Sequence, residues 1–408
     1  MSSPAIDVLI VGGGPAGVAA ALALRKSGVH KVVLLDREAE LGGATRHCSH
    51  SPFGMLEYKR VFIGAAYGRR LAADARAAGV DIRTQHSVIR FEGESSVLVS
   101  SPKGVETLSA RRIITTTGAR ETPRSARLIS GERPIGVITT GTLQAYVAFH
   151  GLMPFRRPVI VGSEMVSMSA ILTCLSHGAK PVALVESGPQ AVARAPFTWL
   201  PRVVGIPFHL DTTIADIWGK ERVEAVSLKS GDQIRKLQCD GVLLTGQFTP
   251  ESTLFLNAEY GVQRGSAGPC VDQDGRLQNP YHFAAGNVLR GVETGGWAFR
   301  EGRSVGRVVA NDLLLGACSA DAIPVQYDTP IKLVVPGMVR KSQIAQSAFT
   351  HFQVRVTRRV QGEISLRIDG KTVWQQRTKW LPERRILVPI PREASNARTI
   401  EFSFQESQ

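Results

Sequence analysis

Residues 6–17 read IDVLIVGGGPAG, and they are followed by VAAALALRKSG at 18–28 and by VVLLD at 32–36. The apolar run 6–11 has the composition of a buried strand, and the small residues after it suit a packed helix. Gly12, Gly14 and Gly17 have the G-x-G-x-x-G spacing. A strand, a glycine turn, a helix and a second strand that ends on an acid together predict a dinucleotide-binding βαβ unit.

Each residue of this segment has an expected role. Gly12 allows a tight turn, Gly14 lets the backbone approach a pyrophosphate, and Gly17 lets the helix pack against the sheet. The N-terminus of the helix presents free N–H groups and a partial positive charge to phosphates. Asp36 is expected to accept hydrogen bonds from ribose hydroxyls. The segment therefore predicts a bound adenine dinucleotide.

A second βαβ outline begins near residue 158. The strand 159–161 leads to Gly162, a helix is expected over 166–177, and the strand 182–185 ends on Glu186. The three glycine positions hold Gly162, Glu164 and Ser167. Glu164 would place a carboxylate where a pyrophosphate binds, which is unfavourable for two like charges. The sequence therefore still predicts the βαβ fold, but NAD(P) binding is in doubt. Glu164 is interpreted as a helix-start residue and Glu186 as a remnant of the fold.

Length and composition set the outer limits. A chain of 408 residues is expected to form two or three domains. No apolar run approaches the ~20 residues of a membrane-spanning helix, and the first residues do not resemble a signal peptide. Five scattered cysteines without a C-x-x-C motif favour free thiols in a reducing compartment. These cysteines are Cys48, Cys174, Cys239, Cys270 and Cys318.

The net charge of +14 can be explained in several ways. It is either a solvated basic surface, or it suits an acidic partner, an anionic substrate or a membrane surface. Nucleic acid is disfavoured because the basic residues are dispersed and lack interleaved stacking aromatics. We expect a cytoplasmic location, with peripheral attachment to the inner face of the membrane as the alternative. No metal site is expected.

The predicted secondary structure changes near Val325: before it helices and strands alternate, and after it only short strands with alternating polarity are expected. The predicted fold class is α/β, with two Rossmann-like three-layer ββα nucleotide-binding domains, the first discontinuous, and a C-terminal all-β domain. The expected division is 1–122 with 240–322, 123–239, and 325–408. A strand is expected at 241–244 and a helix from about 295 to 315. Strands are expected in the last part at 331–335, 352–359, 364–368, 374–378, 385–388 and 399–404.

Three further motifs carry a family resemblance. T-T-G-A at 116–119, T-G-Q-F-T-P at 245–250 and A-A-G-N at 284–287 follow the order seen in flavoproteins related to thioredoxin reductase and the pyridine nucleotide-disulfide oxidoreductases. In that superfamily the first fingerprint holds FAD and the second holds NAD(P)H. The resemblance implies FAD contacts, with Asn287 replacing the usual acid. The implied contacts are Gly12, Gly14, Pro15, Ala16, Gly17, Asp36, Arg37, Gly42, Gly43, Thr117, Gly118, Gly286, Asn287 and Thr294.

The stretches 41–54, 131–144 and 285–302 resemble a narrower group. That group comprises the flavoproteins associated with anaerobic glycerol-3-phosphate dehydrogenase and the α subunits of dye-linked proline, hydroxyproline, opine and cyanide-forming glycine dehydrogenases. The resemblance implies an FAD-dependent subunit that oxidises, or relays electrons from, a small hydroxy-acid, amino-acid or polyol-phosphate substrate. Its implied partners are a second flavoprotein, a small ferredoxin-like subunit, or both. The alternatives are a free-standing NAD(P)H-dependent reductase or oxidase, and a non-catalytic relay or scaffold subunit.

The catalytic residues cannot be identified from the sequence, and the candidates are His47, Cys48 and Trp297. Cys48 lies between His47 and His50, where related reductases carry redox cysteines, but a lone cysteine cannot perform dithiol exchange. The alternative is that this segment only packs beside FAD. Trp297 either covers the flavin or fills the core. Further along the chain, a solvated helix face is expected for Arg300, Glu301 and Arg303, and basic residues suited to an acidic partner are Arg355, Arg358, Arg359, Arg367, Lys379, Arg384 and Arg385.

Overall fold

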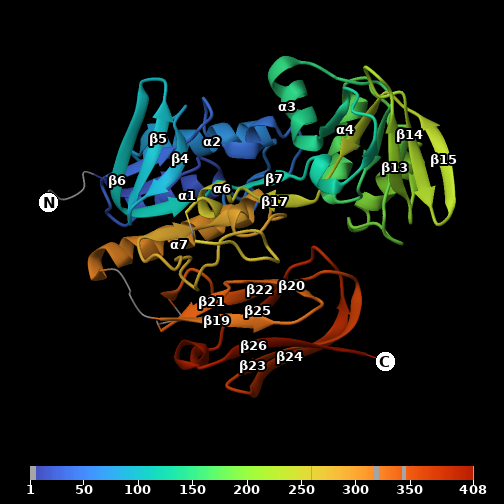
Figure 1. The fold of residues 1–408 in the computed structure, drawn as a ribbon. Helices are drawn as coiled ribbons and strands as arrows, with labels where there is room; N and C mark the ends of the chain where they lie inside the picture. Colours follow the sequence, from blue (N-terminus) through green and yellow to red (C-terminus); the bar gives the residue numbers. More distant parts are fainter. Residues whose placement is uncertain (1–5, 259, 317–320, 342–345, 408) are drawn as a thin grey trace.

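The computed structural model describes residues 6–258, 260–316, 321–341 and 346–407. Figure 1 shows three units: two α/β units side by side, and a β-rich unit packed beneath the long helix α7 (Gly295–Leu315). The predicted fold class is confirmed, with parallel Rossmann-like sheets followed by mostly antiparallel C-terminal sheets. No helix within the described ranges is long and apolar enough to cross a membrane.

The first unit is built on a parallel sheet centred on β1 (Ile6–Val11) and β6 (Gly104–Thr115). Val8 of β1 pairs with Val32 on one side and with Arg112 on the other. All residues of β1 except Asp7 are buried, which explains its continuous apolar run. The other parallel strands, in the order β3-β2-β1-β6-β18, are β2 (Val32–Leu35), β3 (Asp81–Arg83) and β18 (His282–Ala284).

Helices and a meander complete this unit. The long strand β6 turns from the parallel sheet into an antiparallel meander with β4 (Ser87–Glu92) and β5 (Ser96–Ser101). The helices are α1 (Pro15–Lys26), α2 (Gly64–Ala77) and α7. α1 and α7 pack closely, because a Cβ at Gly306 would lie 2.6 Å from the carbonyl oxygen of Ala20.

The second unit repeats this layered plan. Its parallel sheet has the order β12-β11-β10-β16-β9, and an antiparallel sheet, β15-β14-β13 with the short β8, forms another layer. α3 (Thr140–His150) and α4 (Met165–Ser176) belong to this unit. The strands are β8 (Ser130–Gly131), β9 (Val137–Thr139), β10 (Pro158–Val161), β11 (Ala183–Val185), β12 (Phe208–His209), β13 (Thr213–Trp218), β14 (Ala225–Ser230), β15 (Gln233–Gln238) and β16 (Gly241–Leu244).

The chain crosses between the two α/β units at a two-stranded ladder of β7 (Ala119–Glu121) and β17 (Phe248–Pro250). This placement corrects the expected division at residue 240. β16 pairs in parallel with β10 and β9, so it is a strand of the second sheet, and the chain returns to the first unit only after it.

The C-terminal unit consists of two packed sheets, with the orders β21-β19-β26-β23-β24 and β20-β22-β25. The strand predicted at 331–335 is found at those residues, whereas β19 and β21 were not expected and the unit begins shortly before residue 325. The strands are β19 (Ala322–Tyr327), β20 (Ile331–Val335), β21 (Met338–Arg340), β22 (His351–Val356), β23 (Val360–Ile368), β24 (Lys371–Trp380), β25 (Ile386–Pro389) and β26 (Ile400–Glu406).

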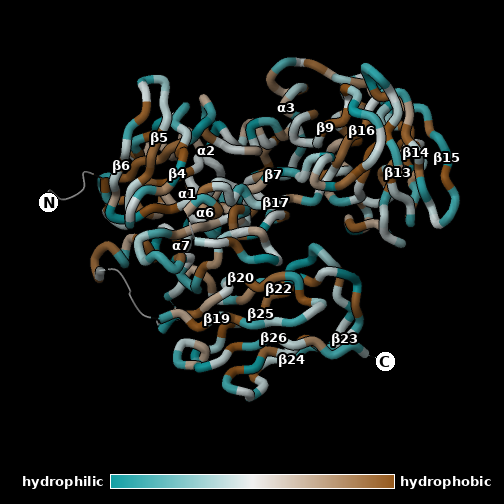
Figure 2. Tube along the Cα trace, viewed as in Figure 1, coloured by the Kyte–Doolittle hydropathy of each residue, from teal (hydrophilic) through white to brown (hydrophobic). Residues whose placement is uncertain are grey.

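One hydrophobic core runs through the first unit and the C-terminal unit, while the second unit has two clusters of its own. Figure 2 shows hydrophobic residues along the strands inside each unit and hydrophilic residues on the outer turns. The remaining short helices are α5 (Leu200–Val203), α6 (Thr253–Leu256) and the 3-10 turns Gly43–His47, Ser125–Arg127, Phe197–Trp199, Gly286–Val288 and Arg392–Asn396.

Candidate dinucleotide site and its surroundings

The carboxyl ends of β1, β6 and β18 meet at one edge of the first sheet, and the glycine turns of the predicted site lie there. The Thr116 N–H donates to the carbonyl of Val11 at 2.8 Å, and the Ala285 N–H donates to the carbonyl of Thr115 at 3.2 Å. The Gly42 N–H donates to the carbonyl of Gly13 at 2.8 Å. Segments from four distant parts of the sequence therefore converge where open α/β sheets bind ligands.

Two of the glycines are required by close packing of the backbone. Gly12 has φ +107°, and a Cβ there would lie 2.6 Å from the carbonyl oxygen of Thr116. A Cβ at Gly17 would overlap the carbonyl oxygen of Gly12 and lie 2.7 Å from Oγ1 of Thr116. The first helix thus rests directly on the turn, as the spacing predicts.

Gly14 and Gly118 instead face open space. A Cβ at Gly14 would meet nothing nearer than the Cα of Gly43 at 3.9 Å, and a Cβ at Gly118 would meet no atom within 4 Å. Gly14 is also the N-cap of α1, so free N–H groups of the first turn face this space. The structure therefore leaves open space over the backbone of Gly14 and Gly118, called the groove below, at the position where the motif places a pyrophosphate, and the residues fit that group.

Asp36 is buried behind the glycine turn. Its Oδ2 accepts from the Gly13 N–H and its Oδ1 from the Glu38 N–H, both at 2.8 Å. Burial raises the pKa of Asp36, although these two backbone donors act in the opposite direction. Each oxygen keeps a second lone pair, so the carboxylate can still accept from a ribose hydroxyl. Neighbouring Arg37 points to solvent, with 69% of its side chain exposed, and pairs only with Glu38 in the described structure.

Asn287 braces the loop that follows β18. Its Nδ2 donates to the carbonyl of Glu293, and its Oδ1 accepts from the Glu293 N–H, both at 3.1 Å. The amide therefore closes a loop between the Gly286 turn and the start of α7. Gly286 itself contacts α1, since a Cβ there would lie 2.8 Å from the Cβ of Ala16. The first turn of α7 also lies beside α1, because a Cβ at Gly295 would come within 3.8 Å of Pro15, and Thr294, the N-cap, is exposed.

A buried cluster of charged residues beneath this loop was not predicted. Arg290 is fully buried; its guanidinium pairs with Glu301, and its Nε donates to Oε1 of Gln353 at 3.0 Å. Glu301 also accepts from the Gly286 N–H at 3.2 Å, which ties the predicted cofactor turn to the cluster. Arg355 Nη2 donates to Glu293 at 2.6 Å. Gln353 and Arg355 belong to β22, so the C-terminal unit holds the loop in place.

This cluster corrects two expectations, and it leaves both expected roles of Trp297 open. Glu301 is not on a solvated face, because it is only 6% exposed and pairs with Arg290. Arg355 and Arg385 are not free for a partner, because both pair with Glu293 inside the protein. Trp297 packs against the guanidinium of Arg385, whose Cζ lies 3.9 Å from the ring centroid, so it joins α7 to the C-terminal unit.

The segment after Gly43 lies against the second unit. Cys48 Sγ lies 3.7 Å from Oε1 of Gln144 in α3, and Gln144 Nε2 donates to Oγ of Ser169 in α4 at 2.9 Å. Ser169 Oγ in turn lies 2.8 Å from Nδ1 of His50. Burial lowers the pKa values of His47 and His50, which favours neutral rings at pH 7. The residues form one polar chain between the units.

Cys48 is poorly suited to redox chemistry. Burial, with a smaller effect from Glu121, raises the pKa of its thiol to about 12. The thiolate is the reactive form, so Cys48 is protonated and inert near neutral pH. The four described cysteines, Cys48, Cys174, Cys239 and Cys270, are all free; Cys318 lies outside the described residues.

We expect Cys48→Ser to leave the flavin absorbance spectrum and the rate of turnover nearly unchanged. The serine hydroxyl can keep the contact with Gln144, and no thiolate is lost because the thiol stays protonated. Absorbance spectra of both proteins after dithiol reduction check this. A long-wavelength charge-transfer band in the wild type that disappears in the variant would contradict an inert Cys48.

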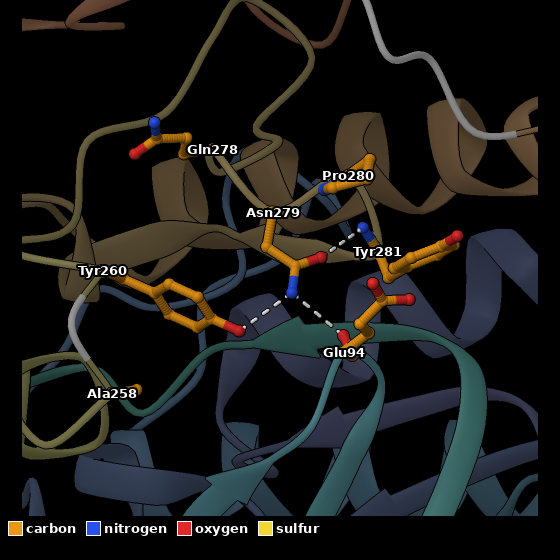
Figure 3. A pocket seen from close by; sticks show the side chains of 7 residues that line it. All are labelled: Glu94, Ala258, Tyr260, Gln278, Asn279, Pro280 and Tyr281. Atoms are coloured by element: carbon orange, nitrogen blue, oxygen red, sulfur yellow. Dashed lines mark hydrogen bonds between the residues drawn. The ribbon is translucent and has the colours of Figure 1, made fainter.

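A shallow cavity of about 480 Å³ lies at the opposite end of β18, away from the glycine turns. Asn279 spans it, with Nδ2 donating to the carbonyl of Glu94 at 3.0 Å and to the hydroxyl of Tyr260 at 2.9 Å (Figure 3). The Oδ1 of Asn279 also accepts from the backbone N–H of Tyr281 at 2.9 Å. The hydrogen bonds of Asn279 therefore connect the meander to the loop before β18.

Two Rossmann-like units with open backbone at the first glycine turn are the architecture expected of an oxidoreductase with two dinucleotide-binding domains. The chain belongs to the pyridine nucleotide-disulphide oxidoreductase family, whose model matches residues 6–302. Members of this family typically bind FAD. Among the described residues, no group of His, Cys, Asp or Glu side chains is arranged to hold a metal ion.

Curated relatives include components of oxidases. The opine oxidase components of Agrobacterium tumefaciens (strain Ach5) and Rhizobium meliloti (strain 1021) are 24% identical over 69% of this chain and 26% identical over 44% of it, respectively. The alpha subunit of sarcosine oxidase from Corynebacterium sp. (strain P-1) is 26% identical over 46%. The chain spans 61%, 38% and 20% of the lengths of these three relatives.

Solved structures support the fold. Thioredoxin reductase of T. acidophilum matches with a TM-score of 0.63 and 23% identity, over 76% of this chain and 98% of that protein. L-proline dehydrogenase of P. horikoshii matches with a TM-score of 0.55 and 18% identity, over 77% of this chain and 57% of that one.

Proposed function

We propose that this chain is the FAD-containing subunit of a multi-subunit dehydrogenase or oxidase that oxidises a small amino acid carrying a secondary amine. The observation that carries the proposal is the contrast between the two glycine turns. The first leaves open space at Gly14 and Gly118, whereas the second is filled by its own side chain at Glu164. One unit is suited to FAD, and the other is not suited to the nicotinamide nucleotide that a free-standing reductase requires.

The residues that would hold FAD are those of the groove. Backbone around Gly14 would receive the pyrophosphate, Asp36 the adenosine ribose, and the Gly286 turn with the α7 N-terminus the flavin half. FAD would supply the two-electron acceptor for substrate oxidation. The protein's own contribution is orientation and electrostatics: the N-terminus of α7 offers a partial positive charge, and the Arg290 and Arg355 cluster keeps that helix and its loop fixed.

The substrate class rests on the relatives. Opines, sarcosine and proline all carry a secondary amine beside a carboxylate, and the names of the similar proteins contain these three words. The alternative substrates are hydroxy acids and polyol phosphates such as glycerol 3-phosphate, and the experiment below includes glycerol 3-phosphate for this reason.

A partner protein is supported by two observations. The curated relatives are named as subunits. The β24 edge of the C-terminal sheet is largely exposed and basic, with Arg377 and Lys379 on it, and an edge strand of this kind suits an acidic partner such as a ferredoxin-like protein. The second candidate function, that of a non-catalytic FAD-containing relay or scaffold, is compatible with the same edge.

The test is the native complex, purified through a tag on this chain. We expect co-purification of at least one further protein and release of FAD by acid. Under anaerobic conditions proline, sarcosine or octopine should bleach the flavin absorbance, while NADH should not. Bleaching by glycerol 3-phosphate alone would replace the substrate class, and rapid bleaching of the isolated chain by NADH would contradict the proposal. Full turnover by a complex whose copy of this chain cannot bind FAD would favour the scaffold.

A further inference from the structure

The second glycine turn is occupied by the side chain of Glu164. This residue is the N-cap of α4, the position that Gly14 has in α1. A Cβ at Gly162 would lie 2.6 Å from its Oε2, and a Cβ at Gly246 would collide with its carboxylate. In the first unit the turn that corresponds to Gly246 is Gly118, where the same space is open. The two turns therefore differ in one respect: the Glu164 side chain fills a space in the second unit that is open in the first.

Neighbouring groups hold the Glu164 carboxylate in that space. Thr245 Oγ1 and Ser167 Oγ donate to its Oε2 at 3.2 and 3.4 Å. Arg127 fixes the turn by donating to the carbonyls of Thr245 and Gly246, both at 2.9 Å, and its charge favours the ionised carboxylate. Burial nevertheless raises the pKa of Glu164 to about 7. The carboxylate thus lies at a helix N-terminus, beside a cation, as a phosphate would.

The strand pairing and the acid of the second site are preserved, whereas Ser167 replaces the third glycine. β10 and β11 pair in parallel as β1 and β2 do, and β11 is followed by Glu186. Glu186 is buried and accepts from the Gly188 N–H at 2.9 Å and from the hydroxyl of Ser163, as Asp36 accepts from backbone N–H groups in the first unit. An acid at this position suits the free ribose hydroxyls of NADH rather than the 2′-phosphate of NADPH.

The geometry points to Glu164 as an internal occupant of the second pyrophosphate position, and its side chain, rather than the loss of the third glycine at Ser167, keeps NADH out. The inference rests on the proposed function, since it explains why electrons come from substrate rather than from a nicotinamide nucleotide. It adds that the second unit discriminates by one side chain, whose volume excludes the phosphates.

The experiment compares NADH binding to FAD-loaded wild type, Glu164→Gly and Glu164→Gln by isothermal titration calorimetry at pH 7.5. We expect no measurable NADH binding by the wild type at 1 mM. Glu164→Gly should bind NADH at least tenfold more tightly, a change of about 1.4 kcal/mol, and should bind NADPH more weakly than NADH. Glu164→Gln keeps the volume of the side chain and should behave like the wild type.

Two controls make the result interpretable. Ser167→Gly restores a fingerprint glycine but leaves Glu164, so it should bind NADH no better than the wild type. FAD content and melting temperature of each variant show that the first unit is intact, and Glu164 makes no capping hydrogen bond that its replacement by glycine would remove.

Four results would overturn the inference: tight NADH binding by the wild type, equal binding by Glu164→Gly and wild type, restored binding in Glu164→Gln, or restored binding in Ser167→Gly. These outcomes are separate from failure of the proposed function. That failure would appear as no substrate-dependent bleaching in the native complex, whichever way NADH binds to the variants.

Discussion

Gly14→Glu is expected to yield a folded chain that contains no FAD. Gly14 has φ −76°, a value open to any residue, and a Cβ there meets no atom closer than 3.9 Å, so the protein itself tolerates a side chain. A glutamate would extend into the groove and place a carboxylate at the pyrophosphate position, as Glu164 does in the second unit. Absorbance at 450 nm and acid release of flavin measure the loss, which should exceed about 90% of the wild-type content, because the new carboxylate occupies the pyrophosphate position and repels its like charge.

The matched control is Lys26→Glu at the exposed last turn of α1. It introduces the same side chain into the same helix, far from the groove, and should keep full FAD content. Circular dichroism of both variants should match the wild type. A yellow Gly14→Glu protein with wild-type FAD content would show that the cofactor binds elsewhere.

Arg290→Met is expected to give the largest loss of stability among single substitutions in the described cluster. Arg290 is fully buried and pairs with Glu301, so its removal leaves a buried carboxylate without its cation. Breaking one side of a buried ion pair costs about 3–5 kcal/mol. Because Glu301 also holds the Gly286 N–H at 3.2 Å, the FAD dissociation constant should rise as well. Urea unfolding and fluorescence titration with FAD measure the two effects.

Two controls separate pairing from simple loss of an arginine. Arg303 lies on α7 at an exposed position close to Glu301, and Arg303→Met should change stability by less than about 0.5 kcal/mol. The double variant Arg290→Met/Glu301→Gln removes both charges and should recover much of the loss, since a neutral amide can still accept from Gly286. Equal effects of Arg290→Met and Arg303→Met would contradict the role of the cluster.

The same cluster couples the C-terminal unit to the first unit. Its β22 residues hold the loop after β18, and its core is continuous with that of the first unit. Deleting residues 325–408 would therefore expose apolar surface and release that loop, so it removes FAD support together with any partner contact. Charge reversal on the exposed edge, for example Arg377→Glu with Lys379→Glu, leaves the interior intact and isolates the partner contact.

Strong local patterns made much of the fold predictable. The strands at 6–11, 241–244 and 331–335 and the helix at 295–315 have the predicted bounds, because each is a clear apolar run or begins after a glycine turn. β19 and β21 escaped prediction because they are short and gain their stability from pairing with distant strands. β16 was assigned to the wrong unit, since strand partners are not encoded in the local pattern.

In the site too, features set by the local sequence could be predicted and features set by distant contacts could not. The glycine spacing predicted the open groove and the filled second turn, because both follow from which positions carry a Cβ. The charged cluster could not be predicted, because Arg290 and Gln353 lie 63 residues apart in the sequence. Glu301 also stands near Arg300 and Arg303, a charge pattern typical of an exposed helix face. Only tertiary packing shows that β22 covers this face of α7.

The most direct test of the account is a native mass spectrum of the purified chain in the presence of 1 mM NADH. We expect each 44.1 kDa chain to carry one FAD and no nicotinamide nucleotide. A spectrum with no bound FAD, or one with NADH bound beside FAD, would contradict the assignment of one open and one closed dinucleotide site.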